Sequence, residues 1–407
     1  MNMKYIILVG DGMGDHPLEE LQGRTPLMAA QTPNLDRLVL KGRLGLVRTI
    51  PEGMEPGSDV ANMSLLGYDP LKYHTGRGPI EAASMGIQLT HEEVAFRCNL
   101  VNLEKDSSGV LRMGDYSSGH ISNGESHRLV ASLQSILQGM PLRLYPGVSY
   151  RHLLIWSGGP PHIETTPPHD IIGQPIAPYL QRYQDEPVLH AFVENAAAIL
   201  AEHPVNLERV ARGKCPANAV WPWGQGRAPS MPTLKKRYGL TGAMISAVDL
   251  LKGLGVYAGL TAVSVPGATG YLDTNYEGKV TAAIDALEVG DLVFVHIEAP
   301  DEASHEGNLE RKLQAIEAFD ERVLGPLVAG AGKFSKVRMM VVTDHLTPIK
   351  MRTHVADLVP FLLVEDLHAG SSGCRSDTRF CESAAKQTGW LIPSGPELFD
   401  AFVGQKD

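Results

Sequence analysis

The sequence predicts an α/β protein built on a mostly parallel β-sheet with helices on both faces. Three short apolar runs, residues 4–9, 291–298 and 336–343, have the length and the Ile, Leu and Val content of buried strands. Stretches with helical spacing of apolar residues stand between them, and such alternation indicates βαβ units. The third observation concerns residues 76–238, where polar turns and a Pro-rich stretch interrupt the alternation.

The N-terminal part begins with one strand and one helix. Residues 4–9 form the strand, which ends in the Gly-rich turn GDGMGD that contains Asp11. Residues 32–42 are expected to be helical because Thr32 occupies an N-cap position, proline follows it, and glycine ends the stretch. Further helices are expected at residues 242–255 and 306–330.

Two domains follow from this pattern. Residues 1–75 and 239–407 carry the alternating strands and helices and are expected to form one domain. Residues 76–238 are expected to form a second, α+β domain inserted into the first, with an amphipathic helix at residues 187–202.

Composition and charge argue against two classes of partner. The chain has 407 residues and a formal net charge of -10, without the Lys and Arg run of a nucleic-acid-binding face. No apolar run approaches the ~18 residues of a membrane span, so we expect a cytoplasmic protein. The cysteines lack CxxC spacing, which predicts reduced thiols. They are Cys98, Cys215, Cys374 and Cys381.

Acidic and histidine side chains follow each of the three predicted strands. They are Asp11 after the first strand, Glu298 and Asp301 after the second, and Asp344 and His345 after the third. Ligands of open parallel α/β sheets bind beyond the carboxyl ends of the strands, so we expect these side chains to converge. Clustered carboxylates repel one another unless a cation lies between them, and histidine ligands favour zinc or a transition metal.

The spacing of these residues favours two metal ions. Asp301 and His305 stand four residues apart, on one face of a helix, and can chelate together. Asp344 and His345 are adjacent and point to opposite sides of an extended backbone, so they do not easily complete one site. The residues left to fill both sites are His354 and Asp11. Two ions suit an in-line phosphoryl displacement, although each residue alone is more often a turn former, a cap or a surface residue.

Ser58 is the candidate nucleophile. It follows a Pro-Gly turn and precedes the helical stretch DVANMSLL, so it is expected at the N-cap, at the positive end of the helix dipole. A divalent cation there would activate its hydroxyl by lowering the hydroxyl pKa. The local sequence by itself favours the alternative that Ser58 only caps the helix.

The chain resembles the archaeal-type cofactor-independent phosphoglycerate mutases of the alkaline phosphatase superfamily over nearly its whole length. The motifs are GDGMGD with TPNLDRL, PGSDVANMSLLGYDP, GRGPIEAASMGI, WPWGQGR, PGATGYLDTNYEGK, HIEAPDEASHEG and VTDHLTP. The resemblance implies an alkaline-phosphatase-like sheet, an inserted substrate-binding cap, and a nucleophilic serine at Ser58. It also implies one metal site of Asp11, Ser58, Asp344 and His345 and another of Asp301, His305 and His354.

The same resemblance gives the inserted domain the role of holding the substrate. A guanidinium offers two parallel donors to a carboxylate or a phosphate, so arginines lead the candidates. The stronger candidates are Arg97 and Arg227, and the weaker ones are Asn99, Arg77 and Lys279, with ordinary salt bridges as the alternative. Relatives often carry arginine where this chain has His120, which bears on substrate identity. His169 and Asp170 are either functional or part of a Pro-anchored turn.

The resemblance therefore implies an isomerase that interconverts 3-phosphoglycerate and 2-phosphoglycerate, in glycolysis or gluconeogenesis, through a phosphoserine at Ser58. Two divalent ions per chain are expected, with manganese (Mn2+) favoured over Zn2+, Co2+ or Mg2+. One alternative is a phosphatase or phosphotransferase that acts on another small hydroxy acid, such as homoserine. The other is a non-catalytic protein that binds a phosphorylated ligand. The sequence does not assign an oligomeric state.

Overall fold

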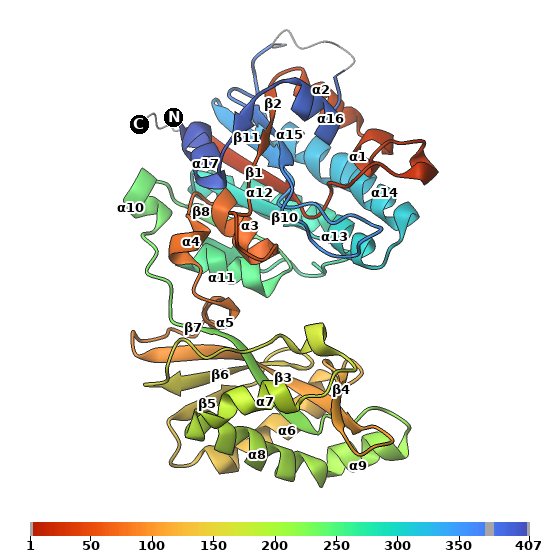
Figure 1. The fold of residues 1–407 in the computed structure, drawn as a ribbon. Coiled ribbons are helices and arrows are strands. Elements are labelled where there is room, and N and C mark those ends of the chain that lie inside the picture. The colour runs from red at the N-terminus through yellow and green to blue at the C-terminus, as the bar shows by residue number, and fades with distance from the viewer. Residues whose placement is uncertain (1–2, 371–377, 405–407) are drawn as a thin grey trace. The chain divides into compact units, whose positions relative to one another are not determined.

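The computed structural model describes residues 3–370 and 378–404. The chain forms two compact units: unit 1 comprises Met1–His74 and Ser230–Asp407, and unit 2 comprises Thr75–Pro229 (Figure 1). Residues 230–238, which the sequence analysis placed in the insertion, therefore belong to unit 1. The reason is that Leu234 is buried there and its N–H donates to the carbonyl of Ala258 at 2.8 Å.

The central sheet of unit 1 has eight strands in the order β13-β2-β12-β11-β1-β10-β8-β9. Neighbouring strands are parallel except that β12 runs antiparallel to β11 and to β2. Every residue of β10 is buried, as expected for a sheet covered on both faces, and the predicted fold class is confirmed. The strands are β1 (Lys4–Gly10), β2 (Arg43–Val47), β8 (Gly242–Ile245), β9 (Thr261–Val263), β10 (Leu292–Ile297), β11 (Val337–Val342), β12 (Val359–Val364) and β13 (Leu391–Ile392).

Helices cover both faces of this sheet (Figure 1). On one face, apolar side chains of α2, α12, α15 and the π-helical segment η4 form one core cluster with Ile6 and Leu8 of β1. On the other face, Phe402 of α17 meets the ring of Tyr5 edge-on, at a centroid distance of 5.5 Å. The main helices of unit 1 are α2 (Pro33–Val39), α3 (Ser58–Leu65), α10 (Leu234–Tyr238), α11 (Asp249–Tyr257), α12 (Tyr276–Val289), α13 (Ala299–His305), α14 (Leu309–Ala318), η4 (Phe319–Leu324), α15 (Gly325–Ala331), α16 (Glu382–Gln387) and α17 (Gly395–Val403).

The helix expected at residues 242–255 is wrong in its first part. Gly242–Ile245 forms strand β8, parallel to β10, and helix α11 begins only at Asp249. A short apolar run does not by itself distinguish a buried strand from a helix. A Cβ atom at Gly242 would lie 1.8 Å from the carbonyl oxygen of Leu292, so glycine lets the two strands approach closely.

The N-terminus of α2 is capped by a residue distant in sequence. Thr32 holds the N-cap position, but its side chain makes no capping hydrogen bond. Instead, the carboxylate of Asp320 in η4 accepts hydrogen bonds from the N–H groups of Asn34 at 3.1 Å and Leu35 at 2.7 Å. Tertiary packing therefore supplies the cap that the local pattern assigned to Thr32.

Unit 2 has an antiparallel five-stranded sheet, in which β4, β3, β6 and β5 follow one another and β7 also pairs with β3. Alternate residues of β3, among them Phe96 and Cys98, pack against α6 and α8 in one core cluster, so Arg97 and Asn99 lie on the opposite face. The elements are α5 (Arg77–Ser84), β3 (Glu93–Lys105), β4 (Leu111–Asp115), α6 (Asn123–Leu133), β5 (Leu142–Tyr145), β6 (Arg151–Ser157), α7 (Ala177–Gln184), α8 (Pro187–Ala201), α9 (Pro204–Ala211) and β7 (Ala219–Gly226).

Two sequence-level expectations concern the whole chain. Within residues 3–370 and 378–404, none of the helices combines the length and apolar character needed to cross a membrane. Cys98, Cys215 and Cys381 are free thiols, and Cys374 lies outside the described residues.

Candidate active site

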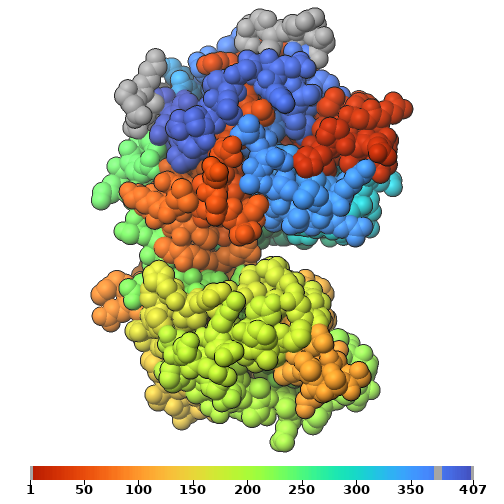
Figure 2. Space-filling view, in the orientation of Figure 1, coloured from red at the N-terminus to blue at the C-terminus, as the bar shows by residue number. Residues whose placement is uncertain are grey.

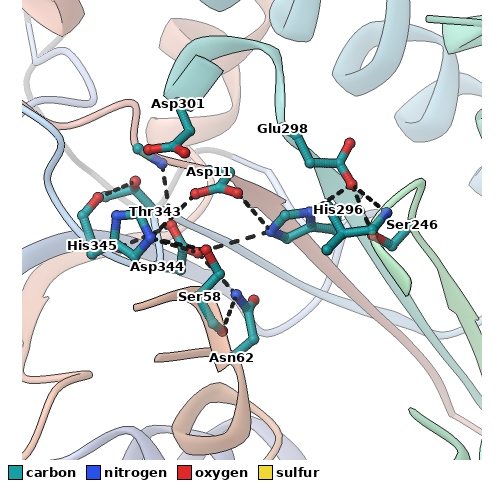
Figure 3. A network of polar contacts seen from close by, with 12 residues as sticks. Asp11, Ser58, Asn62, Ser246, His296, Glu298, Asp301, Thr343, Asp344 and His345 are labelled. Atoms are coloured by element: carbon teal, nitrogen blue, oxygen red, sulfur yellow. Dashed lines mark hydrogen bonds and ion pairs between the residues drawn. The ribbon is translucent and has the colours of Figure 1, made fainter. Parts of the chain in front are cut away.

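Three side chains from the carboxyl ends of β1 and β11 form a fully buried group, here called the Asp11 cluster. It consists of Asp11, Asp344 and His345. The Nε2 atom of His345 lies 3.4 Å from Asp11 Oδ1 and 3.5 Å from Asp344 Oδ2 (Figure 3). The N–H groups of Gly12 and His345 donate to Asp344 Oδ1, at 3.2 and 2.8 Å, and hold this carboxylate in place.

A second group, here called the Asp301 cluster, consists of Asp301, His305 and His354. Asp301 and His305 lie one turn apart on α13, and His305 Nε2 is 3.1 Å from Asp301 Oδ2. His354 comes from the segment after β11, and its Nε2 lies 3.0 Å from His305 Nε2 and 3.6 Å from Asp301 Oδ1. The structure therefore brings together the two sets of Asp and His residues that the family resemblance implied.

The two clusters adjoin each other. The ring centroids of His345 and His354 are 4.1 Å apart. In Figure 3, Asp301 lies beside Asp11, and Ser58 lies below them with Asp344 and His345. On the surface of unit 1, the blue segment that contains residues 345–354 lies beside the orange segment that contains residues 50–70 (Figure 2). Both clusters therefore belong to one site.

The carboxylates of the Asp11 cluster are buried and lie close enough to repel each other. Burial raises the pKa of Asp11 well above its ordinary value, and the neighbouring carboxylates of Asp344 and Asp301 raise it further. Burial also opposes ionisation of Asp344, but His345 and His296 outweigh it and lower its pKa to about 2. Asp11 Oδ1 is buried and has no hydrogen-bond partner, because the 3.4 Å approach of His345 lacks hydrogen-bond geometry. A buried, partnerless carboxylate oxygen is costly, so this set of donors fits a cation.

The Asp301 cluster also fits a cation. His305 Nδ1 lies 2.9 Å from the carbonyl of Arg352, so Nδ1–H donates there and Nε2 carries a lone pair in the neutral ring. This Nε2 faces the Nε2 of His354 at 3.0 Å, and two nitrogens at that distance need a proton or a metal ion between them. Burial lowers the pKa of His305, but Asp301 outweighs burial and raises it to about 9, so a proton takes this place in the metal-free protein.

Ser58 is the first residue of α3, and the N-cap position belongs to Gly57. The predicted capping role of Ser58 is therefore wrong. Its Oγ lies 3.2 Å from His345 Nε2, on the Asp11 cluster. One turn later, Asn62 Nδ2 donates to the carbonyl of Ser58 at 2.8 Å and to Asp344 Oδ2 at 2.9 Å, and so ties the helix to the cluster (Figure 3).

Sequence reasoning missed three residues at this site, Asn62, His296 and Thr347. His296 is fully buried on β10, with Nε2 3.3 Å from Asp11 Oδ2. A histidine inside the apolar run LVFVHI is a usable signal, because a buried imidazole needs polar surroundings. Asn62 stands one helical turn from Ser58, which is a weaker signal. Nothing in the local sequence distinguishes Thr347, whose hydroxyl donates to Asp301 Oδ1 at 2.5 Å.

Two of the predicted residues, Glu298 and Lys279, form a buried ion pair, and Glu298 Oε1 lies 3.2 Å from His296 Nδ1. Glu298 joins neither cluster: its Oε1 accepts a hydrogen bond from Ser246 Oγ at 2.8 Å and its Oε2 pairs with Lys279 Nζ at 2.9 Å. Lys279 is fully buried and also donates to the carbonyl of His296 at 3.1 Å. The suggestion that Lys279 binds substrate therefore fails, because its ammonium is enclosed and already paired.

The substrate-binding candidates on β3 of unit 2 differ in their surroundings. Asn99 is buried, and both ends of its amide are engaged, with Trp223 Nε1 at 3.0 Å and the carbonyl of Tyr116 at 3.2 Å. This pairing argues against a role in binding substrate. Arg97 stacks over Trp223, 4.6 Å from the ring centroid, and its Nε lies 3.0 Å from Glu81 Oε1. The ion pair with Glu81 is the salt-bridge alternative that the sequence left open. It neutralises the charge of Arg97.

Arg97 belongs to a group of basic and aromatic side chains in unit 2. The group comprises Arg77, Arg97, Tyr116, His120, His169 and Trp223. Arg77 lies 5.9 Å from the Trp223 centroid, and the ring of His169 lies 5.4 Å from it. Burial lowers the pKa of His169; Asp170 opposes this effect, and Arg77 and Arg97 add to it. Arg227, at the end of β7, and Asp170 are exposed. Two arginines over one aromatic ring, Arg77 and Arg97, suit an anionic ligand.

Comparison with known proteins identifies the family. A sequence model of 2,3-bisphosphoglycerate-independent phosphoglycerate mutase matches residues 40–206. A probable 2,3-bisphosphoglycerate-independent phosphoglycerate mutase of Geobacter sulfurreducens is 49% identical over 401 residues, which cover 98% of this chain and 100% of that protein. The chain belongs to this family. The member from Methanothrix thermoacetophila is 52% identical over 403 residues, covering 98% of this chain and 100% of its own length.

Solved structures agree with membership in the 2,3-bisphosphoglycerate-independent phosphoglycerate mutase family. A Pyrococcus horikoshii protein superimposes with a TM-score of 0.82 at 28% identity, covering 100% of this chain and 99% of that one. The cofactor-independent phosphoglycerate mutase of Thermoplasma acidophilum does so with a TM-score of 0.62 at 29% identity, covering 99% of both chains. The resemblance inferred from the motifs is therefore confirmed.

Proposed function

We propose that this protein interconverts 3-phosphoglycerate and 2-phosphoglycerate without 2,3-bisphosphoglycerate, through a phosphoserine at Ser58. The observation that carries the proposal is the position of Ser58 Oγ, 3.2 Å from His345 Nε2 and beside two Asp/His clusters. The names of the relatives support the substrate and the reaction. The Ser58 hydroxyl does not cap its helix, and it faces a buried cluster of candidate metal ligands. This position favours a nucleophile over the alternative of a non-catalytic protein that binds a phosphorylated ligand.

We further propose that each cluster holds one divalent ion. Asp11, Asp344 and His345 would bind the first with Ser58, and Asp301, His305 and His354 would bind the second. Mn2+ is the preferred ion, with Zn2+, Co2+ and Mg2+ as alternatives, because the donor atoms are a mixture of carboxylate oxygen and imidazole nitrogen. Bound ions would lower the pKa of the Ser58 hydroxyl and neutralise the oxygens of the transferring phosphoryl group.

The chemistry assigned to the chain's own groups is a double transfer. Ser58 Oγ forms a bond to phosphorus while the bond from phosphorus to the C3 oxygen of glycerate breaks, and the serine proton ends on the released hydroxyl. The C2 oxygen then forms a bond to phosphorus while the bond from phosphorus to Ser58 Oγ breaks, and the proton of the C2 hydroxyl passes to Ser58 Oγ. Asn62 keeps the first turn of α3 fixed to Asp344 during both steps, through its bonds at 2.8 and 2.9 Å.

The proposal gives unit 2 the task of retaining glycerate between the two transfers. Water at ~55 M competes for a phosphoserine, so the glycerate must be held at a higher effective concentration. Arg97, Arg77 and Arg227 are the proposed carboxylate and phosphate ligands, and the aromatic ring of Trp223 orients the first two. The cytoplasmic location stays a prediction.

The test is an assay of the purified, Mn2+-loaded protein with 3-phosphoglycerate and no 2,3-bisphosphoglycerate. Formation of 2-phosphoglycerate as the main product is the expected result. Release of mostly inorganic phosphate would favour the phosphatase alternative. No reaction with 3-phosphoglycerate, together with phosphorylation of Ser58 by another phosphorylated hydroxy acid, would favour the related phosphotransferase.

A further inference from the structure

We propose that the hydroxyl of Thr347 is a positioning group shared by the two clusters. It lies 2.5 Å from Asp301 Oδ1 in the Asp301 cluster and 3.2 Å from His345 Nδ1 in the Asp11 cluster. In this arrangement Thr347 fixes the tautomer of His345 and the orientation of Asp301 together. The inference rests on the proposed metal-binding role of the clusters and not on the identity of the substrate.

The hydrogen-bond roles follow from the donor inventory. An ionised carboxylate only accepts hydrogen bonds, so the single proton of the Thr347 hydroxyl is donated to Asp301. The hydroxyl oxygen can then only accept from His345, so His345 Nδ1 must carry the proton. His345 Nε2 consequently bears the lone pair, and this is the nitrogen that faces Ser58 and both carboxylates of the Asp11 cluster.

The backbone of Thr347 is anchored on both sides, which fixes the position of its hydroxyl. Its N–H donates to the carbonyl of Gly14 at 3.3 Å, and its carbonyl accepts from Lys312 Nζ at 3.0 Å. Lys312 is fully buried and also contacts the carbonyl of Gly14 at 3.2 Å and Asp15 Oδ2 at 2.8 Å. The ammonium of Lys312 thus connects the turn after β1, which carries Asp11, with the segment after β11, which carries His345.

The turn after β1 leaves room for the contact between the Thr347 hydroxyl and Asp301. Gly12 has a φ of +59°, and a Cβ atom there would lie 2.5 Å from Asp301 Oδ1 and 2.7 Å from Thr347 Oγ1. Any side chain at this position would therefore push apart the hydroxyl and the carboxylate that it binds. Gly12 also donates its N–H to Asp344, so the same residue supports both clusters.

The tautomer can be measured directly in the metal-free protein. Nitrogen-15 labelling of the histidines, with His345→Gln to assign the signal, should show His345 protonated at Nδ1 alone. Thr347→Val keeps the shape of the side chain and removes the hydroxyl, so the signal should change to the Nε2–H form or to a mixture. Thr347→Ser restores the hydroxyl and should restore the Nδ1–H form. Thr343→Val is the matched control, because among the described residues the buried Thr343 hydroxyl bonds only backbone groups, the N–H of Met13 and the carbonyl of His345.

Calorimetric titration with Mn2+ supplies the second readout. Loss of a partner that orients metal ligands typically weakens metal binding about 10- to 100-fold, so Thr347→Val should weaken both sites by about tenfold or more, and Thr347→Ser by less than about threefold. An Nε2–H tautomer of His345 in the wild type would overturn the proposal, even if Thr347→Val does not fold. A Thr347→Val protein that binds Mn2+ with the affinity of the wild type would also overturn the proposal. Neither measurement uses substrate, so a missing mutase activity and a wrong role for Thr347 are distinguishable outcomes.

Discussion

The two clusters have similar ligand types but opposite electrostatic situations. The Asp11 cluster is fully buried and pairs two carboxylates with one histidine, and it leaves Asp11 Oδ1 without a hydrogen-bond partner. The Asp301 cluster pairs one carboxylate with two histidines, and the side chain of His305 is 34% exposed. Without metal, the first cluster therefore holds two buried carboxylates that repel each other, whereas in the second the carboxylate faces two histidines that it attracts.

Because of this difference, a metal ion should contribute differently to protein stability in the two clusters. In the Asp11 cluster an ion relieves repulsion between buried carboxylates, so it should stabilise the fold strongly and exchange slowly. In the Asp301 cluster an ion replaces a proton that already stabilises the site, so it should add less stability and exchange faster. Ser58 lies on the Asp11 cluster, and His354 lies where the two clusters meet.

Chelation should produce the largest effect and should act on the clusters in sequence. Excess EDTA is expected to remove one metal equivalent quickly, from the Asp301 cluster, and a second one slowly. Turnover should already be lost when the first metal equivalent leaves. The thermal midpoint should fall mainly when the second equivalent leaves, because an ion bound only to the folded state stabilises it by ~3 kcal/mol at 100 times its Kd. Metal analysis during dialysis, with His354→Gln to delete the fast phase, checks this order. Full turnover of a metal-free preparation would contradict the account.

The metal-free protein should lose stability between pH 6.5 and about 9. Burial lowers the pKa of His305, but Asp301 outweighs burial and raises it from 6.5 to about 9. A raised histidine pKa stabilises the fold while the ring is protonated, so the contribution is complete below pH 6.5 and lost as the pH rises to about 9. Because the side chain is partly exposed, we expect roughly 1–2 kcal/mol.

Urea denaturation in EDTA at pH 6 and pH 9 measures this loss. His305→Gln should remove the difference between the two pH values. His190→Gln, which changes an equally exposed histidine on α8 of unit 2, should keep it. The same pH dependence in wild type and in His305→Gln would show that the Asp301 cluster does not hold the proton.

Replacing one carboxylate in each cluster should have effects of opposite sign on the metal-free protein. Burial and three neighbouring carboxylates raise the pKa of Asp11, so Asp11→Asn removes a repelled charge and should raise the free energy of unfolding by about 1 kcal/mol. Burial opposes ionisation of Asp301 as well, but His305 and His354 outweigh it and hold its pKa well below the ordinary value. Asp301→Asn should therefore lower the free energy of unfolding by a similar amount. Changes of the same sign in EDTA would remove the proposed distinction.

The sequence predicted which acidic and histidine side chains lie together, because their positions follow from sheet geometry. Parallel strands end at one edge, so an acidic residue after each strand is enough to place Asp11 and Asp344 together. The helical spacing of Asp301 and His305 is equally local. Glu298 shows where this reasoning fails. It also follows a strand, but it pairs with Lys279 of α12, and the sequence does not show that α12 packs close to it.

The rest depended on tertiary contacts that leave no local trace. The cap of α2 comes from Asp320, far along the chain, and the strand β8 is defined by its pairing with β10. Thr347 is an ordinary threonine in sequence, and its importance comes from the two side chains that its hydroxyl touches. Ser58 lies on the Asp11 cluster, as a nucleophile would, but the N-cap position expected for it belongs to Gly57.

Rapid acid quenching of the Mn2+-loaded protein with 3-phosphoglycerate, followed by tandem mass spectrometry of the peptide that contains Ser58, tests the central claim most directly. The account predicts phosphate on Ser58 within the first turnovers, no phosphate at this position in Ser58→Ala, and a loss of turnover on the order of 10³-fold or more in that variant. An unmodified Ser58 in the wild type, together with near-normal turnover of Ser58→Ala, would contradict it.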